Sequence, residues 1–161
     1  MNIFYLQREP EACAHDHCDK HVPKMILEYA QLMSTAHREL DGDDCVDQLY
    51  KSTHKNHPSA IWARSSDQQY MWLYELFCAL SEEYQLRYKK EHLTYTKLHG
   101  LLKYLPRNIQ TNGFTDPPQC MPDEYKHDNC ITAYREFYRH DKSRFAKWKY
   151  SDVPTWYIQM E

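Results

Sequence analysis

The stretch that decides the fold is DQQYMWLYELFCALSEEYQLRY, residues 67–88. Its apolar and aromatic side chains recur every three or four positions, which is the spacing of one face of an α-helix. The stripe consists of Tyr70, Leu73, Phe77, Leu80, Tyr84 and Tyr88, widened by Trp72 and Leu76. The pattern predicts a long helix after Asp67 that buries this face in the core.

A second helical pattern occupies residues 19–40, where polar side chains run beside an apolar stripe. Asp19 is expected to cap this helix, its first turn tolerates Pro23, and Asp41-Gly42 should end it. The apolar stripe consists of Val22, Met25, Ile26, Tyr29, Met33, Ala36 and Leu40. The polar flank consists of His21, Lys24, Glu28, Gln31 and Thr35. The carboxylate of Glu28 is therefore expected to lie next to the buried apolar face of this helix.

Shorter elements should surround these two helices. We expect a helix from Pro10 to about Cys18, one entered at Pro58, one from about Leu93 to near Pro106, and a last one, capped by Asp128 or Asn129, to about Trp148. Residues 3–6 form too short an apolar run for a helix and are expected as an extended arm or edge strand packed on the core. Residues 107–124 are expected as a surface loop, and the aromatic tail at 153–157 should pack back on the core.

The scarcity of glycine and valine argues against a sheet-based fold. The 161 residues include three Gly, and the valines are Val22, Val46 and Val153. A hydrophobic content of 42% is enough to build one core. The sequence therefore predicts an all-α fold, a single compact helical domain over residues 1–161 with a short extended N-terminal arm.

Several classes of function are disfavoured by what the sequence lacks. Neither G-x-G-x-x-G nor G-x-x-x-x-G-K-[ST] occurs, which disfavours hydrolysis of nucleoside triphosphates. The start carries no basic n-region, and no apolar run of about 18 residues follows, so we expect neither secretion nor a membrane partner. Six scattered Cys without a C-x-x-C pair, including Cys45, predict reduced thiols in a cytoplasm.

The overall charge offers no general attraction to a phosphate backbone. The formal net charge is −3 and the pI is about 6.4. Charge can nevertheless be segregated, because residues 134–149 carry six bases and two acids. The bases of this segment are Arg135, Arg139, Lys142, Arg144, Lys147 and Lys149. One face of the molecule can therefore still be basic.

Thiol and imidazole side chains near the N-terminus form a candidate zinc site. The cluster consists of Cys13, His15, His17, Cys18 and His21. Its spacing matches neither C-x-x-C nor H-E-x-x-H, so ordinary surface histidines and half-buried cysteines are the favoured interpretation, and no metal or other cofactor is expected. A zinc-dependent site remains a third alternative.

Two further features each have a functional and a structural interpretation. A carboxylate beside an apolar wall, such as Glu28, can act in proton transfer, whereas Lys24 and Glu28 are also an i, i+4 pair of the kind found on solvated helices. The turn at residues 55–58 can present His57 to a ligand, or Asn56 can simply cap the next helix. The aromatic residues can stack on bases, but most fall on helical stripes and are interpreted as core.

The order of these parts resembles the phage pyrimidine-dimer DNA glycosylases, also called endonuclease V, and their bacterial relatives. The resemblance covers nearly the whole chain. It is carried by the arm Met1-Asn2-Ile3-Phe4, by His21 and Glu28 seven residues apart on a long helix, by the turn Lys55-Asn56-His57-Pro58, by the aromatic helix at 70–88, and by the tail Pro154-Thr155-Trp156-Tyr157.

The resemblance implies a covalent mechanism of base excision. In that family the α-amino group of the first residue attacks the deoxyribose C1′, expels a damaged base and forms a Schiff base, assisted by a helix glutamate. Met1 would supply the amine here and Glu28 would stabilise the sugar cation. The attack is chemically reasonable because the pKa of an α-amino group is generally about 7.7–8.0, roughly three units below that of lysine. A useful fraction of the amine is therefore neutral and nucleophilic at neutral pH. β-Elimination would then nick the strand.

The resemblance also implies a partner and a set of contacts. The partner is DNA containing a damaged or modified base, in the cytoplasm, or in that of the host if the chain is phage-encoded. The implied substrate-binding residues are His21, Lys24, Gln31, Lys55, Asn56 and His57. The chain departs from the family at Leu27 and Gln31, where dimer-repair members carry phosphate-binding arginines, and Lys20, Lys24 and Lys55 are the available substitutes.

Two classes of function therefore compete on the sequence alone. The first is a DNA glycosylase with amine-dependent lyase activity. The alternative is a non-enzymatic module that binds a nucleotide or small ligand in a pocket formed by His21, Glu28 and His57, and the acidic balance of the chain favours it. Their dependence on salt distinguishes them, because duplex binding weakens steeply as salt rises.

Overall fold

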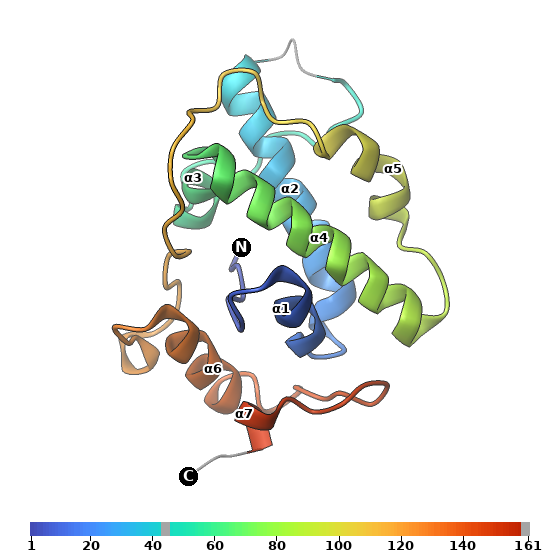
Figure 1. Cartoon of the computed structure of the whole chain (residues 1–161), viewed down its shortest axis with the longest axis vertical. Coiled ribbons are helices and arrows are strands. Elements are labelled where there is room, and N and C mark those ends of the chain that lie inside the picture. The colour runs from blue at the N-terminus through green and yellow to red at the C-terminus, as the bar shows by residue number, and fades with distance from the viewer. Residues whose placement is uncertain (43–45, 159–161) are drawn as a thin grey trace.

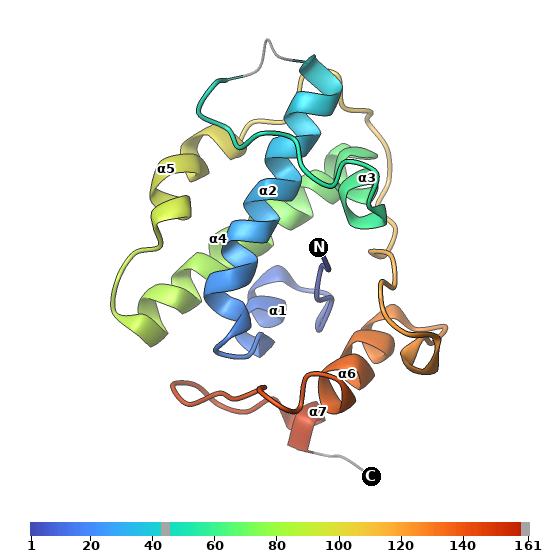
Figure 2. The same ribbon diagram turned by 180° about the vertical axis from the view of Figure 1, so that it is seen from behind.

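Two long helices cross at the centre of the molecule. The computed structural model describes residues 1–42 and 46–158, and within them α2 (His21–Asp41) and α4 (Asp67–Tyr88) form the middle of the fold (Figures 1 and 2). The other helices are α1 (Pro10–Asp16), α3 (Pro58–Arg64), α5 (Leu93–Leu102), the 3₁₀ turn η2 (Asp123–Tyr125), α6 (Cys130–His140) and α7 (Thr155–Ile158). The described part of the chain contains no strand, so the predicted all-α fold is confirmed.

The two predicted stripes form the core. On α2, all predicted stripe residues up to Ala36 are buried, and on α4 the same holds from Tyr70 to Leu80. Only the ends differ, because Leu40, Tyr84 and Tyr88 are partly exposed. Buried side chains from all parts of the described chain join one continuous hydrophobic cluster, which fits a single domain.

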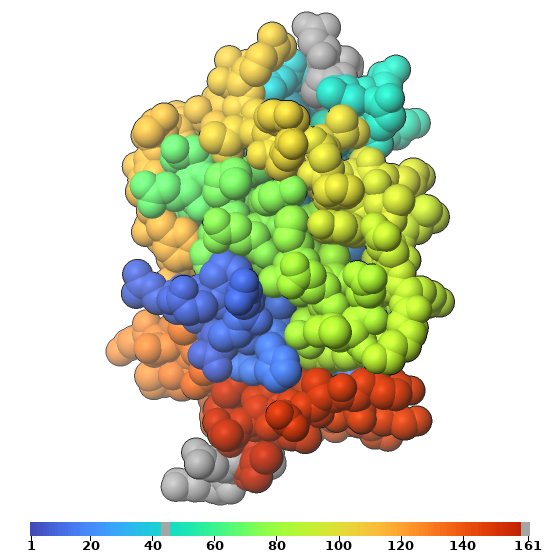
Figure 3. Space-filling view, turned by 45° about the vertical axis from the view of Figure 1, so that its right-hand side comes forward, coloured from blue at the N-terminus to red at the C-terminus, as the bar shows by residue number. Residues whose placement is uncertain are grey.

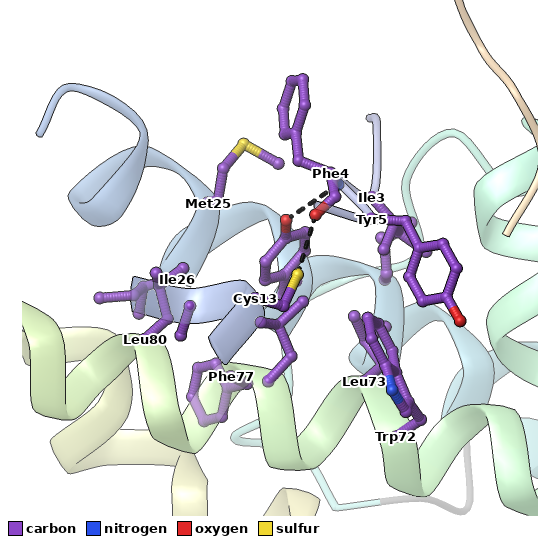
Figure 4. Packing of buried hydrophobic residues seen from close by; sticks show 14 of the residues in the cluster. Ile3, Phe4, Tyr5, Cys13, Met25, Ile26, Trp72, Leu73, Phe77 and Leu80 are labelled. Atoms are coloured by element: carbon purple, nitrogen blue, oxygen red, sulfur yellow. Dashed lines mark hydrogen bonds between the residues drawn. The ribbon is translucent and has the colours of Figure 1, made fainter. Parts of the chain in front are cut away.

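The N-terminal arm is extended and buried. Residues 3–6 have at most 4% of their surface exposed, and they lie among α1, α2 and α4 (Figure 4). They form no edge strand, because their backbone groups bond to side chains and, within the arm, the N–H of Leu6 donates to the carbonyl of Phe4 at 3.0 Å. Phe4 is held through both its N–H and its C=O, and the carbonyl of Leu6 accepts from Arg135 Nε at 3.0 Å. The predicted arm is confirmed, and its terminus lies in the middle of the molecule between α2, α3 and α6.

The predicted cap of α2 is wrong. Lys20 occupies the N-cap position and makes no side-chain capping bond. The carboxylate of Asp19 instead binds Arg87 at 3.2 Å and accepts the backbone N–H of Lys149 at 2.6 Å. Long-range partners therefore displace the local capping role. At the other end Gly42 has a φ of 72°, which a residue with a side chain rarely adopts, so the predicted stop is confirmed.

Arg87 ties α4 to the segment between α1 and α2. Its guanidinium is 1% exposed, and it pairs with Glu83 at 2.9 Å as well as with Asp19. It also donates to the carbonyls of His17 at 2.8 Å and His15 at 2.9 Å. Every face of this buried cation is thus satisfied, which fixes the chain just before α2.

The last long helix is shorter than predicted. Asn129 caps α6, accepting from Thr132 N–H at 2.9 Å, but the helix ends at His140 rather than near Trp148. The segment after it, residues 141–149, turns back to meet the start of α2, where the carbonyl of Lys147 accepts from the N–H of Asp19 at 2.8 Å. Figure 3 shows this C-terminal part, in red, lying against α1 and the end of α4.

The remaining predictions are mostly confirmed. α1 ends at Asp16, α5 at Leu102, and residues 107–122 form a loop that leads into η2. The tail packs back through Trp156, whose Nε1 donates to Asp16 at 2.7 Å. Five cysteines in the described ranges are free thiols, and Cys45 lies outside those ranges. In the described ranges, none of the helices has the length and apolar character needed to cross a bilayer.

Candidate functional site

A pocket of about 460 Å³ opens where the N-terminal arm meets α2 and the segment after α6. Its wall is formed by Met1, Asn2, Phe4, Lys20, His21, Lys24, Met25, Glu28, Lys142, Arg144 and Phe145. A volume of this size is typical of a small-molecule or nucleotide site. The lining comes from three segments that are far apart in the sequence.

The centre of the pocket is an amine beside a carboxylate. The α-amino nitrogen of Met1 lies 3.6 Å from Glu28 Oε1, and the side chains of Met1 and Glu28 are only 7% and 16% exposed. Lys24 Nζ approaches the other oxygen of Glu28 at 3.9 Å from one helical turn away, with its own side chain mostly in solvent. A nucleophilic amine and a group able to move protons or balance positive charge therefore share one site.

The position of Glu28 follows from the pattern of α2. Two neighbours of Glu28 on the helix surface, Met25 and Tyr29, are fully buried. Lys24, one turn before Glu28, is exposed. Glu28 lies at the boundary between the buried and the exposed face of α2, as its position on the polar flank predicts. The helix thus presents the carboxylate at the edge of the core rather than in open solvent.

A buried hydrogen-bond chain fixes the arm that carries the amine. Phe4 N–H donates to the hydroxyl of Tyr29 at 3.2 Å, and the thiol of Cys13 donates to the carbonyl of Phe4 at 3.1 Å (Figure 4). Burial raises the pKa of Cys13 to about 12, so the thiol remains a donor. Both backbone groups of Phe4 are held, three residues after the amine.

His17 completes that chain in one defined tautomer. Its Nδ1 faces the carbonyl of Cys13 at 2.7 Å and therefore carries the proton, so Nε2 accepts from the Tyr29 hydroxyl at 2.8 Å. Burial lowers the pKa of His17 to about 4, because the charged ring would lose its hydration. A neutral His17 lets the Tyr29 hydroxyl accept from Phe4 while it donates to the imidazole.

His21 forms a neutral wall of the pocket. Its ring stacks on Phe4 with centroids 4.3 Å apart, and Nδ1 lies 2.6 Å from the hydroxyl of Tyr138. That hydroxyl already accepts from Cys18 N–H, so it is assigned as donor to Nδ1, which leaves Nε2–H free for a ligand. Burial first, and then nearby positive groups that include Lys142, hold the pKa of His21 at about 2.

The turn at residues 55–58 contributes one residue to the surroundings of the amine. Thr53 is bound to Thr35 of α2 through both backbone groups, N–H at 3.1 Å and C=O at 3.3 Å. Beyond it, the pKa of His57 is lowered by partial burial and then by the positive charge of the Met1 amine. His57 also caps α3, because its Nδ1 accepts from Ser59 N–H at 3.1 Å, so Asn56 is not the cap.

The structure brings together some of the predicted residues and separates others. Met1, His21, Lys24 and Glu28 all line the pocket. Gln31, Lys55 and Asn56 are not part of its wall, and the last two are exposed. Those three residues therefore lie outside the site as it stands, although the resemblance places them in contact with substrate.

The opposite wall was not predicted as part of the site. Lys142, Arg144 and Phe145 come from the segment after α6, and the ring of Phe145 packs edge-on against His21 with centroids 5.4 Å apart. The local excess of bases in residues 134–149 was the available signal. Its connection to the pocket became visible only because the chain leaves the helix at His140 and turns toward α2.

The proposed zinc ligands do not converge. Cys13 and His17 are used in the arm's hydrogen bonds, His15 lies at the surface 3.4 Å from Glu83, and His21 faces the pocket. Within residues 1–42 and 46–158, no group of three or more His, Cys, Asp or Glu side chains is arranged to hold a metal ion. The arrangement of these described residues therefore does not favour a zinc site at this cluster.

Comparisons with protein-family models, with curated proteins and with solved structures found no match to this chain.

Proposed function

We propose that this chain is a DNA glycosylase with lyase activity that excises a damaged or modified pyrimidine through the α-amino group of Met1. The observation that carries the proposal is the 3.6 Å approach of the Met1 nitrogen to Glu28 inside a pocket large enough for a nucleotide. The fixed arm and the partly buried carboxylate support the same interpretation, because they hold the two groups in place before substrate arrives.

The reaction conserves atoms and charge without a cofactor. The lone pair of the neutral amine attacks C1′, the glycosidic electrons leave with the base, and the base takes up a proton. The attached amine loses a proton, its lone pair forms the C=N bond of the Schiff base, and the C1′–O4′ bond breaks as O4′ takes up a proton. Removal of a C2′ proton then expels the 3′-phosphate by β-elimination. In this scheme Glu28 balances the positive charge that develops on the sugar and accepts protons.

Borohydride trapping tests this proposal directly. The protein is incubated with duplexes carrying an abasic site or an altered pyrimidine, the Schiff base is reduced, and the cross-linked residue is identified by mass spectrometry after the intact mass has confirmed that Met1 is present. We expect the adduct on the Met1 nitrogen. An adduct on Lys24 or Lys142, both in the pocket wall, would contradict the assignment of the nucleophile.

A matched pair of variants tests the carboxylate. Glu28→Gln should lower the trapping rate by roughly a hundredfold or more, as removal of a group that moves protons or stabilises charge does. Glu39→Gln changes the same functional group on the same helix, but Glu39 is exposed and bonded to Ser52, so its trapping rate should be unchanged. Equal rates for the two variants would remove Glu28 from the mechanism.

A second candidate is a module that binds a nucleotide without chemistry. It is favoured by the excess of positive groups in the pocket wall of a chain whose net charge is −3. Binding of a mononucleotide should change little between low and moderate salt, whereas affinity for duplex DNA should fall steeply. Mononucleotide binding together with a complete failure of trapping would replace the first proposal with this one.

A further inference from the structure

We propose that the cations gathered around Phe145 form a phosphate-binding subsite at the pocket. The inference names the ligand chemistry of the proposed active site, so its role there rests on the proposed function. The binding of phosphate itself does not require a reactive amine, and it is therefore measurable on its own.

Three positively charged side chains surround one aromatic ring. Lys20 Nζ lies 4.8 Å from the centroid of Phe145, Arg144 Cζ lies 5.4 Å from it, and Lys142 Nζ lies 5.9 Å from it. Lys20 precedes α2, whereas the other two follow α6. Cations from two distant segments thus converge on one point, where the face of the ring attracts them.

The charges of the pocket are not balanced by acids. The wall carries five positive groups, which are the Met1 amine, Lys20, Lys24, Lys142 and Arg144, against the single carboxylate of Glu28. Lys142 pairs with the neighbouring Asp141 at 3.2 Å, and Lys24 approaches Glu28. Among the described residues, Lys20 and Arg144 have no carboxylate within ion-pair distance. Their mutual repulsion would be relieved by a bound anion.

The segment that carries two of these cations is held in place. On one side Ala146 N–H donates to the carbonyl of Lys142 at 2.9 Å, which closes a turn around Phe145. On the other, the backbone of residues 147 and 149 is bonded at both points to Asp19, next to Lys20. The turn therefore keeps Lys142 and Arg144 opposite Lys20 before any ligand binds, which lowers the entropic cost of binding.

The chemistry of the cluster fits phosphate better than a carboxylate. Two ammonium groups and a guanidinium offer more donors than the two oxygens of a carboxylate use, and the guanidinium fork matches phosphate oxygens. The neutral ring of His21 beside Phe145 adds an N–H donor without adding charge. The phosphate can come from the monoester of a nucleotide or from a diester of a strand whose sugar reaches Met1.

The test compares two double variants by NMR titration. Lys20→Gln/Arg144→Gln removes two unpaired cations from the subsite. Lys147→Gln/Lys149→Gln removes the same charge from the same segment, but at exposed residues outside the pocket wall. We expect the first pair to weaken phosphate binding roughly tenfold or more and the second to leave it nearly unchanged.

Four probes distinguish the source of the phosphate. Inorganic phosphate and 5′-deoxycytidine monophosphate report a monoester site, deoxycytidine is the phosphate-free comparison, and an unphosphorylated oligodeoxynucleotide reports a diester site. Tighter binding of the monophosphate than of deoxycytidine, lost in the first double variant, supports the monoester. Binding of the oligonucleotide alone, with a shallower salt dependence in the first double variant, supports the diester.

The outcomes separate this inference from the proposed function. Protein whose Met1 amine is acetylated should lose Schiff-base trapping and keep phosphate binding. Equal losses in the two double variants, or no binding of any phosphate probe, would overturn the subsite while leaving the trapping result intact. Phosphate binding without trapping would retain the subsite and overturn the proposed chemistry.

Discussion

The hydroxyl of Tyr29 accepts the backbone N–H of Phe4 at 3.2 Å, which links the arm to α2 one residue after Glu28. The same helix therefore supplies the carboxylate of the site and the anchor for the segment that bears the amine. A short path through Tyr29 therefore connects the amine of Met1 to the carboxylate of Glu28.

Replacing that anchor should slow the chemistry as well as destabilise the fold. Tyr29→Phe leaves Phe4 N–H and His17 Nε2 without partners in a buried region, at a cost of about 1–3 kcal/mol per group. At temperatures where the variant remains fully folded, the trapping rate at saturating substrate should still fall about tenfold or more, because the amine is no longer held beside Glu28.

Tyr70→Phe provides the matched comparison. Tyr70 is also fully buried, and its hydroxyl donates to Leu102 O at 2.7 Å and contacts His37 at 2.8 Å, away from the pocket. It should lose comparable stability in urea denaturation and keep the wild-type trapping rate. If both variants trap at the same rate, Tyr29 serves stability alone.

Extending the chain by one residue should abolish trapping. A single alanine added before Met1 moves the amine by about 3.5 Å along the chain, out of reach of the pocket position it now occupies. Thermal denaturation should be nearly unchanged, because the core residues of the arm, Ile3 to Leu6, keep their places. Undiminished trapping by the extended protein would assign the reactive amine to a lysine.

Stability should fall in mild acid because of His17. The pKa of this histidine is lowered to about 4 by burial, so between about pH 6.5 and 4 the unfolded chain binds a proton that the folded chain excludes. The free energy of unfolding should therefore decrease as pH falls through this window, by roughly 1–2 kcal/mol at pH 5 from this group.

His17→Gln should make that dependence shallower, while His21, whose pKa is also lowered by burial, maintains part of it. The measurement is the urea midpoint at several pH values between 7 and 5 for both proteins. His15→Gln is the control, since His15 is about half exposed, and it should leave the slope unchanged. An identical slope in wild type and His17→Gln would show that other groups dominate acid sensitivity.

Loss of the buried guanidinium should be strongly destabilising. Arg87→Met leaves the carboxylates of Asp19 and Glu83 and two backbone carbonyls without their shared donor. We expect a loss of about 3–5 kcal/mol in the free energy of unfolding. Arg87→Lys should recover only part of it, because one ammonium cannot reproduce the guanidinium fork. A loss below about 1 kcal/mol for Arg87→Met would contradict this account.

Local patterns predicted the parts of the fold that depend on local forces. The stripes of α2 and α4 could be identified because burial of an amphipathic face requires only helical spacing, and Glu28 could be placed at the edge of that face. Two capping residues, Asn129 for α6 and Ser66 for α4, also act through neighbouring N–H groups. Only the first of these was identified from the sequence.

Features set by distant partners could not be predicted in this way. Asp19 was predicted to be a helix cap, whereas its carboxylate binds Arg87, which is 68 residues away. The last helix was predicted to continue to about Trp148, but the segment after His140 leaves the helix and its backbone bonds to Asp19. The second wall of the pocket, with Lys142 and Arg144, was therefore missed, even though the excess of bases in that segment was evident.

The bond from Arg135 to the carbonyl of Leu6 joins residues 129 positions apart. During synthesis the arm emerges long before α6 exists, and it cannot reach its final place until that helix and the turn behind it have been made. A nascent or truncated chain would carry the amine on a loose end with no opposing wall of cations. If the proposed mechanism holds, the pocket that positions the amine is complete only after the C-terminal part has been synthesised, since Lys142, Arg144 and Phe145 form its second wall.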